Sequence, residues 1–344
     1  MRLRCSWPFH SGVFFTFALA ASVSSRAANP ILTVHRESPL IPVADVPLPG
    51  AAVRFDYQSF DATTGRLYIA HMNDDHLVVF DVRARRVEAN LPGFHRVHGV
   101  LAVPSLHRVF ATATGDHALV AMDSETLRIV GHAAPIEYPD GVAYAPEQKK
   151  VFVSDEHGGT DAVVNEDATQ ILASIPLGGG AGNTVYDPTT GHILVAVHHL
   201  NQLVAIDPAT NRILTRVALP GIDDPHGIAL DPRDGLAFVA GEGNHSLAVV
   251  RLRDLRVIGA PQSVGDDPDV LAFDPGLRML YVSAESGVVT IFHLNRKTLT
   301  WVGSLTMPHA HTVAVDPSTH LVYFPLQDVD GHPVMRILSP VSQP

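Results

Sequence analysis

Aspartate and histidine recur at a nearly constant interval along this chain. Starting from Asp56, equivalent positions follow at spacings of 42, 42, 42, 44, 43 and 42 residues. Carboxylates and imidazoles bind metal ions and transfer protons, so their repetition is the strongest chemical signal in the sequence. We call this set the ring positions: Asp56, His98, Asp140, Gly182 with the adjacent Asn183, His226, Asp269 and His311.

A second polar set follows the next apolar run of each repeat. It contains further carboxylates and imidazoles, which we expect on the same side of the fold as the ring positions. Together the two sets predict one acidic, histidine-rich ligand-binding face. The second set is His71, Thr114, Glu156 with His157, His198 with His199, Glu242, Glu285 and Gln327. From the two sets we predict ten binding-face residues: Asp56, His71, His98, Asp140, Asn183, His226, Glu242, Asp269, Glu285 and His311.

Three ring positions are candidates for a metal site. If the last repeat adjoins the first, then His311, Asp56 and His98 belong to consecutive repeats. Two imidazoles and one carboxylate suit Zn, Fe, Mn or Cu and leave a position open for water or substrate. The local sequence contains no HExxH motif and no thiolate spacing that would mark such a site.

The same residues also have a purely structural explanation. An Asp or His that precedes Gly can bond backbone groups in its own turn or in the adjacent repeat, as Asp often does. The mixture of Asp and His favours a site, because a structural role that Asp fills in some repeats gives no reason for His in others.

The elements that position these residues follow from the repeat itself. Each copy opens with a short apolar run such as residues 227–230, then has a turn containing Asp and often Gly, and then a second run such as residues 67–70. A third run ends in Asp, and a fourth follows another turn. Short apolar runs separated by turn residues predict strands. Four strands in each of seven copies predict an all-β, seven-bladed β-propeller with four antiparallel strands per blade.

The two ends of the chain bear on how the propeller closes. The last copy stops after its third strand, residues 334–338, whereas residues 40–50 resemble the fourth strands of other copies. We therefore expect the N-terminal strand to complete the last blade and remove an exposed sheet edge. Pro42 and Pro47 suit an outermost strand, where a missing donor costs little.

The first 27 residues predict a secretory signal. Arg2 and Arg4 precede an apolar run over residues 13–21, and small residues stand before a cleavage point after Ala27. The expected organisation is a signal peptide over residues 1–27, a lead-in segment over 28–39 and one propeller domain over 40–344. The protein is then periplasmic or secreted. Cleavage removes Cys5, the only cysteine, and with it any disulfide or thiolate site.

Charge narrows the range of partners. Cleavage changes the formal net charge from −11 to −14, with 21 basic and 35 acidic residues remaining. Such a surface disfavours nucleic acid and anionic membranes and favours cations. No segment beyond the signal is long and apolar enough to span a bilayer. We expect a monomer that binds a small molecule, a metal ion or a protein partner.

Several segments resemble a known family. The relevant residues are Thr-Gly-Arg-Leu-Tyr-Ile-Ala-His at 64–71, Val-His-Gly-Val at 97–100, Pro-Asp-Gly-Val at 139–142 and the Asp-Pro-Ala-Thr turn at 207–210. Over essentially the whole mature chain the sequence resembles the YncE-like, YVTN-repeat β-propellers of exported bacterial proteins. This resemblance implies a seven-bladed propeller with a binding or accessory role, and it supplies no agreed catalytic set.

The leading hypothesis is therefore an exported binding protein that holds a small ligand, a metal ion or a partner on its acidic, histidine-rich face. The alternative is a metal-dependent hydrolase of the lactonase or esterase type, in which a metal-bound water attacks the substrate. A third alternative is a structural module with an inert channel. A divalent metal ion is the cofactor that the candidate residues suggest.

Overall fold

The computed structural model describes residues 38–341, and nearly all of the regular structure there is β-strand. The expected signal peptide, and the lead-in segment up to residue 37, lie outside the described residues. Three short 3-10 helices occur within the described range, and none of its helices has the length and apolar character needed to cross a membrane. They are η1 (Met72–Asp74), η2 (Pro104–Leu106) and η3 (Thr114–Asp116).

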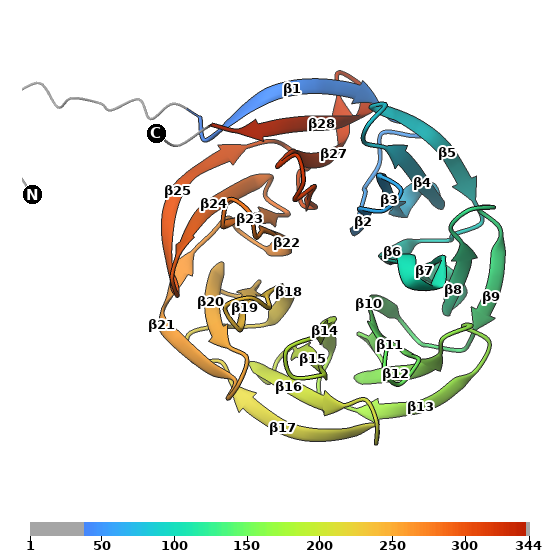
Figure 1. Cartoon of the computed structure of the whole chain (residues 1–344), viewed down its shortest axis with the longest axis vertical. Coiled ribbons are helices and arrows are strands. Elements are labelled where there is room, and N and C mark those ends of the chain that lie inside the picture. Colours follow the sequence, from blue (N-terminus) through green and yellow to red (C-terminus); the bar gives the residue numbers. More distant parts are fainter. Residues whose placement is uncertain (1–37, 342–344) are drawn as a thin grey trace, which may run out of the picture. The chain divides into compact units, whose positions relative to one another are not determined.

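The strands form seven four-stranded antiparallel sheets that surround a central axis (Figure 1). The prediction of a seven-bladed β-propeller is thus confirmed. Blade 1 is β2 (Gln58–Asp61), β3 (Arg66–His71), β4 (His76–Asp81) and β5 (Arg86–Pro92). Blade 2 is β6 (Val97–Val103), β7 (Arg108–Ala113), β8 (Ala118–Asp123) and β9 (Ile129–Ala133). Blade 3 is β10 (Pro139–Ala145), β11 (Lys150–Asp155), β12 (Thr160–Asn165) and β13 (Ile171–Pro176).

The remaining blades follow the same order. Blade 4 is β14 (Ala181–Asp187), β15 (His192–Val197), β16 (Gln202–Asp207) and β17 (Arg212–Ala218). Blade 5 is β18 (Pro225–Asp231), β19 (Leu236–Gly241), β20 (Ser246–Arg251) and β21 (Arg256–Ser263). Blade 6 is β22 (Pro268–Asp274), β23 (Met279–Ala284), β24 (Val288–Asn295) and β25 (Thr298–Thr306). Blade 7 is β26 (Ala314–Val315), β27 (Val322–Val329), β28 (His332–Pro340) and β1 (Leu40–Pro47).

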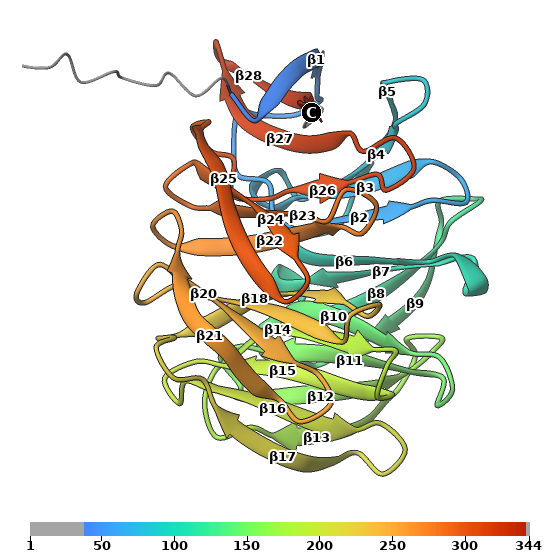
Figure 2. The same cartoon turned by 60° about the vertical axis from the view of Figure 1, so that its left-hand side comes forward.

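Strand β1 is the outermost strand of blade 7 and pairs antiparallel with β28, as both overall views show (Figures 1 and 2). Its register shifts between Pro42 and Ala44, where the proline interrupts the ladder. Arg336 on β28 donates to both carboxylate oxygens of Asp45, at 2.9 and 2.6 Å. A bidentate pair of this kind adds geometric specificity to the pairing of the two strands.

Seven apolar clusters lie between adjacent blades, including one between blades 7 and 1. A middle strand such as β3 is covered on both faces, so Leu67 to Ala70 are all fully buried. The outer strand β17 instead alternates exposed and partly buried residues over much of its length. This difference explains why the middle strands read as continuous apolar runs.

Aspartates at the ends of strands build the turns that the sequence predicted. Asp61 accepts hydrogen bonds from the backbone nitrogens of Thr63 and Thr64, at 2.8 and 3.3 Å, and from both hydroxyls. Burial by itself would raise the pKa of Asp61, but these hydrogen bonds lower it below its ordinary value. Such turns are Asx-turns, which reverse the chain between the first and second strands of a blade.

The innermost strands are irregular where the ring positions occur. In blades 2 to 6 the first and second strands change register near the start of the first strand, at the residues that include the ring position. In blade 5, for example, the register shifts between Pro225 and Ile228, around His226. In blades 1 and 7, Asp56 and His311 precede the first strand. Bulges of this kind leave residues unpaired and redirect their side chains.

One buried acid outside the axial region predicts a pH effect on stability. Asp161 on β12 is fully buried and accepts a hydrogen bond from Thr184 on β14, at 3.1 Å. Burial raises the pKa of Asp161 to about 7 from 3.8. The unfolded chain therefore loses this proton at a lower pH than the folded chain, so folding stability falls as the pH rises through that window.

We expect Asp161→Asn to remove this loss. The free energy of unfolding of the variant minus that of the wild type should rise by roughly 2–4 kcal/mol from about pH 4 to about pH 8. These two pH values lie on either side of the window between the pKa values of 3.8 and about 7. Urea unfolding of both proteins at the two pH values measures the difference. An equal stability difference at both pH values contradicts the assignment.

Candidate functional site

A cavity of about 330 Å³ lies at the axis and is lined by residues from blades 1 to 6. Seven carboxylates, three imidazoles, two guanidiniums and two phenols face it. We call it the axial cavity. Its lining is Arg54, Asp56, Tyr57, Met72, Arg96, His98, Tyr138, Asp140, Glu156, His198, His226, Glu242, Asp267, Asp269 and Glu285.

The structure brings most of the predicted face together. Seven of the ten predicted residues line the axial cavity, namely Asp56, His98, Asp140, His226, Glu242, Asp269 and Glu285. The other three are outside its lining. His71 is fully buried, with its ring stacked on Phe55 at 4.0 Å. Asn183 lies against Gly141, and His311 is buried beside Asp56 and Asp269.

At the ring positions, glycines let the backbone of the next blade approach closely. The hydroxyl of Thr112 accepts from Gly99 N at 2.6 Å and donates to the carbonyl of Asp140 at 2.7 Å. A Cβ on Gly99 would stand 2.1 Å from that carbonyl, so only glycine permits the approach of blade 3. The Asp140 carboxylate takes no part in this contact. Between these two blades the close contact uses the glycine and the carbonyl, so it does not by itself require the Asp140 carboxylate.

Three buried side chains form what we call the Asp–His cluster: Asp56, Asp269 and His311. One ligand atom from each lies within 4.8 Å of the others. Within the described part of the chain, Asp56 Oδ1, Asp269 Oδ1 and His311 Nε2 have no hydrogen-bond partner. The His311 ring donates to the backbone of Phe55. Since Nε2 has no partner, Nδ1 is the donor, and the Nε2 lone pair is free.

Electrostatics in this cluster follow from burial and crowding. Burial is the largest cause that raises the pKa of Asp56, and it raises the pKa of Asp269 well above its ordinary value, together with the negative charge of Asp56. Burial lowers the pKa of His311 to about 3, so its imidazole is neutral. The nearest compensating charge is Arg54, with Nη2 3.6 Å from Asp269 Oδ2 and 4.0 Å from Asp56 Oδ2.

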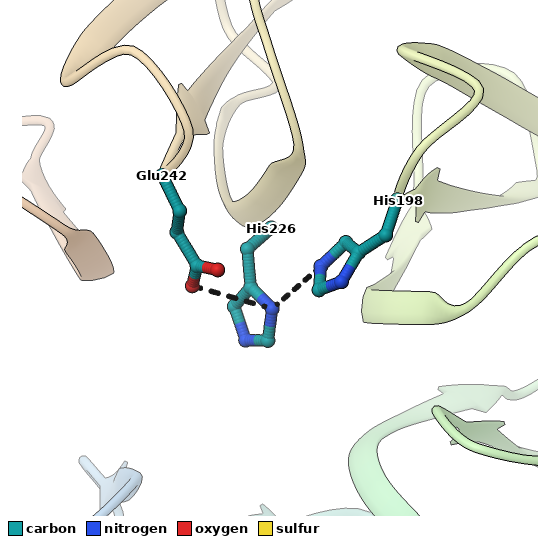
Figure 3. A group of neighbouring side chains, drawn as sticks. All are labelled: His198, His226 and Glu242. Carbon is teal, nitrogen blue, oxygen red and sulfur yellow. Dashed lines mark hydrogen bonds and ion pairs between the residues drawn. The ribbon is translucent and has the colours of Figure 1, made fainter.

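A second group, which we call the His–Glu cluster, contains His198, His226 and Glu242. His198 Nε2 and His226 Nδ1 are 2.9 Å apart, and Glu242 Oε1 is 3.5 Å from the same His226 nitrogen (Figure 3). Burial and the neighbouring His198 lower the pKa of His226 to about 3. Burial and nearby acids raise the pKa of Glu242 to about 8.

His98 also lines the axial cavity. Its Nδ1 is 2.7 Å from the carbonyl of Arg96, to which it donates, so Nε2 keeps a lone pair. That Nε2 accepts from the hydroxyl of Tyr138 at 3.2 Å and is 4.0 Å from Asp56 Oδ2. The predicted metal set of His98, His311 and Asp56 thus has two members in the Asp–His cluster. Asp269 completes that cluster, and His98 adjoins it.

Sequence reasoning missed four lining residues that share one signal. Each stands two positions before a ring position, and alternate residues of an extended chain face the same side. Reading that position in every repeat would have found them. They are Arg54, Arg96, Tyr138 and Asp267.

A second depression is larger but offers little chemistry. The groove between β1 and β25 has a volume of about 740 Å³, and apolar residues make up much of its lining. Its two charged residues, Asp45 and Arg336, bind each other. The axial cavity is therefore the candidate functional site.

No family model matches the sequence, and no curated protein matches it. Among solved structures, virginiamycin B lyase from Staphylococcus aureus is 11% identical, with a TM-score of 0.72 over 87% of this chain and 99% of that one. Hydrazine synthase from Kuenenia stuttgartiensis is 14% identical, with a TM-score of 0.69 over 90% of this chain and 99% of that one. Both contain seven-bladed β-propellers. At such identities the likeness shows the fold alone.

Arg54 is predicted to hold the acidic cavity together at neutral and alkaline pH. Its Nη1 also forms an ion pair with Glu285 at 2.5 Å. We expect Arg54→Met to lower the free energy of unfolding by roughly 1–3 kcal/mol at about pH 8 and by less at about pH 5. The raised pKa values of Asp56, Asp269 and Glu285 let these acids take up protons as the pH falls, which removes the repulsion.

Arg96→Met is the matched control, because Arg96 lines the same cavity but forms no ion pair within residues 38–341. Denaturant unfolding of both variants at the two pH values provides the measurement. A loss for Arg54→Met that is independent of pH would show that only packing is affected.

Proposed function

We propose that this protein binds a divalent cation in its axial cavity through the Asp–His cluster, and that the cavity beside the cation accommodates a small ligand. One observation carries the proposal. Asp56, Asp269 and His311 are buried and offer one ligand atom each within 4.8 Å of the others, and each has one side-chain atom without a hydrogen-bond partner in the described chain. Buried carboxylates without partners are costly, and a bound cation supplies the missing interaction.

The donor set indicates the kind of cation. Two carboxylate oxygens and one neutral imidazole nitrogen suit metals that accept mixed oxygen and nitrogen ligands, such as Mn²⁺, Fe²⁺ and Zn²⁺. The hydrogen bond from His311 to the backbone of Phe55 fixes the ring orientation, as partners of ligating histidines commonly do. Arg54 opposes the cation electrostatically and also stabilises the acids without it, so moderate affinity is expected.

The remaining cavity supports a small ligand more than a protein partner. Its volume of about 330 Å³ is at the lower end for ligand pockets. Arg54, Arg96 and Tyr138 add donors for a polar group beside the carboxylates. A cation with an open coordination position would bind such a ligand directly.

We also propose that the chain is YncE-like and exported to the periplasm or the medium. The support for this is the set of repeat motifs at residues 64–71, 97–100 and 139–142, together with the charged and apolar pattern of residues 1–27.

A metal-dependent ester or lactone hydrolase is the second candidate, and the position of His98 favours it. Its Nε2 lone pair accepts from the Tyr138 hydroxyl and is 4.0 Å from Asp56 Oδ2, so a reacting water that displaced this hydroxyl could give its proton to the same nitrogen. A screen of ester and lactone substrates with Mn²⁺- or Zn²⁺-loaded protein tests this candidate. Turnover that His98→Ala abolishes without loss of metal would support hydrolysis, and no turnover on any substrate would leave the binding role.

The metal proposal makes a prediction about stability as well as binding. We expect Asp269→Asn and His311→Gln to weaken Mn²⁺ binding at least tenfold while they keep or raise stability in the presence of chelator, because Asp269→Asn relieves repulsion among buried acids. For the wild type, Mn²⁺ at a hundred times its Kd should add about 2.7 kcal/mol of stability.

Calorimetric titration with Mn²⁺ and thermal unfolding with and without metal provide these measurements. Asp161→Asn is the control, since it removes a buried carboxylate that is not part of the lining of the axial cavity. If the cluster variants lose stability in chelator and bind Mn²⁺ as tightly as the wild type, the residues serve the fold and the proposal fails.

A further inference from the structure

Beside the Asp–His cluster, two neighbouring blades direct three more ligand-type side chains toward one point. His198 directly follows β15 of blade 4, His226 lies on β18 of blade 5, and Glu242 directly follows β19 of the same blade. All three line the axial cavity, and Figure 3 shows their polar ends turned toward one another. His198 and His226 are buried, whereas the Glu242 side chain is 25% exposed, so a route from the cavity remains.

The distances match the requirements of a metal ion. Ligand atoms at 2.0–2.1 Å from a tetrahedral Zn²⁺ are separated from each other by about 3.3 Å. His226 Nδ1 is 2.9 Å from His198 Nε2 and 3.5 Å from Glu242 Oε1, and all three atoms lie within 4.8 Å of one another. Without metal the two imidazole nitrogens share a hydrogen bond, so a cation would replace the shared proton, and small side-chain movements would then bring the separations to those of a metal site.

The backbone leaves room for this approach of the two imidazoles. A Cβ at position 182 would stand 2.9 Å from His198 Nε2 and 3.0 Å from His226 Cα. Gly182 is the one ring position without a polar side chain. Its lack of a Cβ is what lets His198 reach His226.

Groups behind His226 select the tautomer that a metal needs. Its Nε2 faces the Tyr57 hydroxyl at 3.0 Å, Asp269 Oδ1 at 3.5 Å and Asp140 Oδ2 at 3.7 Å. Two carboxylate oxygens around Nε2 favour a proton on that nitrogen and leave the Nδ1 lone pair for a ligand. Within the described residues the hydrogen-bond partner of Nε2 is the Tyr57 hydroxyl, and ligating histidines commonly have such a fixed partner on the other ring nitrogen.

We propose that His198, His226 and Glu242 form a second metal site, which prefers Zn²⁺ and similar nitrogen-binding metals. Two nitrogens and one carboxylate are a softer donor set than the two carboxylates and one nitrogen of the Asp–His cluster. This inference goes beyond the proposed function and shares no ligand with it. Asp269 nevertheless connects the sites, because it belongs to the first cluster and faces the ligating ring of the second.

The test is a Zn²⁺ titration of the chelator-treated full mature chain, with stoichiometry from calorimetry and elemental analysis. We expect two Zn²⁺ per chain for the wild type and one for His198→Ala, and at least tenfold weaker binding at the second site for Glu242→Gln. Co²⁺ should give the intense visible absorption of a tetrahedral nitrogen and oxygen site, and His198→Ala should lose it.

His199→Ala is the matched control. His199 is the adjacent histidine, but its side chain is 79% exposed and forms an ion pair with Asp224, so its loss should leave the Zn²⁺ stoichiometry unchanged. Circular dichroism and thermal unfolding establish whether each variant is folded. If His198→Ala does not fold, the more conservative Glu242→Gln variant tests the same site.

The two sites fail separately in this experiment. Both sites are supported if the His311→Gln variant binds one Zn²⁺ per chain and the double variant with His198→Ala binds none. If His198→Ala and Glu242→Gln reduce Zn²⁺ binding and His311→Gln does not, the second site is supported and the first is contradicted. Unchanged stoichiometry and affinity in folded His198→Ala and Glu242→Gln overturns the inference, whatever His311→Gln does.

Discussion

The structure depends on the requirement that every sheet bury both of its faces. Each of the seven apolar clusters is shared by two adjacent blades, so no blade has a core of its own. The middle strands must then be apolar on both sides, as Leu67 to Ala70 are. Polar chemistry is excluded from those strands and confined to strand ends and to the axis. The concentration of ionisable groups around one cavity is a direct consequence.

At the axis the blades approach each other through backbone atoms. Gly99 admits the carbonyl of Asp140, and Thr112 bridges the two. Although His98 and His226 bond the hydroxyls of Tyr138 and Tyr57, these backbone contacts do not use the carboxylate and imidazole side chains at the ring positions. They nevertheless remain buried, and burial is the largest cause of the raised pKa of Asp269 and the lowered pKa of His311. Groups that destabilise the fold where they stand are typical of functional sites.

Much of this architecture was predictable from the sequence, because the repeat fixes where each first strand begins. Seven of the ten predicted face residues line the cavity for that reason. The sequence did not reveal that Asp269 would join Asp56 and His311, since irregular pairing at the start of each first strand redirects the side chains there. His71 lies outside the lining, where its ring stacks on Phe55, and no periodicity in the sequence indicates that contact.

The charge balance of the cavity decides what kind of ligand it suits. Seven carboxylates face two guanidiniums. Burial raises the pKa values of six of these acids, and repulsion from neighbouring acids adds to the effect for most of them, among them Asp140 and Glu242. Proton uptake relieves part of this excess, and Arg54 relieves another part through three of the acids. Neither mechanism provides partners for the unpaired atoms of Asp56, Asp269 and His311. The divalent cation that we propose would neutralise the acids and also provide these partners, because it would accept the lone pair of the neutral imidazole. A proton shared among the carboxylates leaves that lone pair unused.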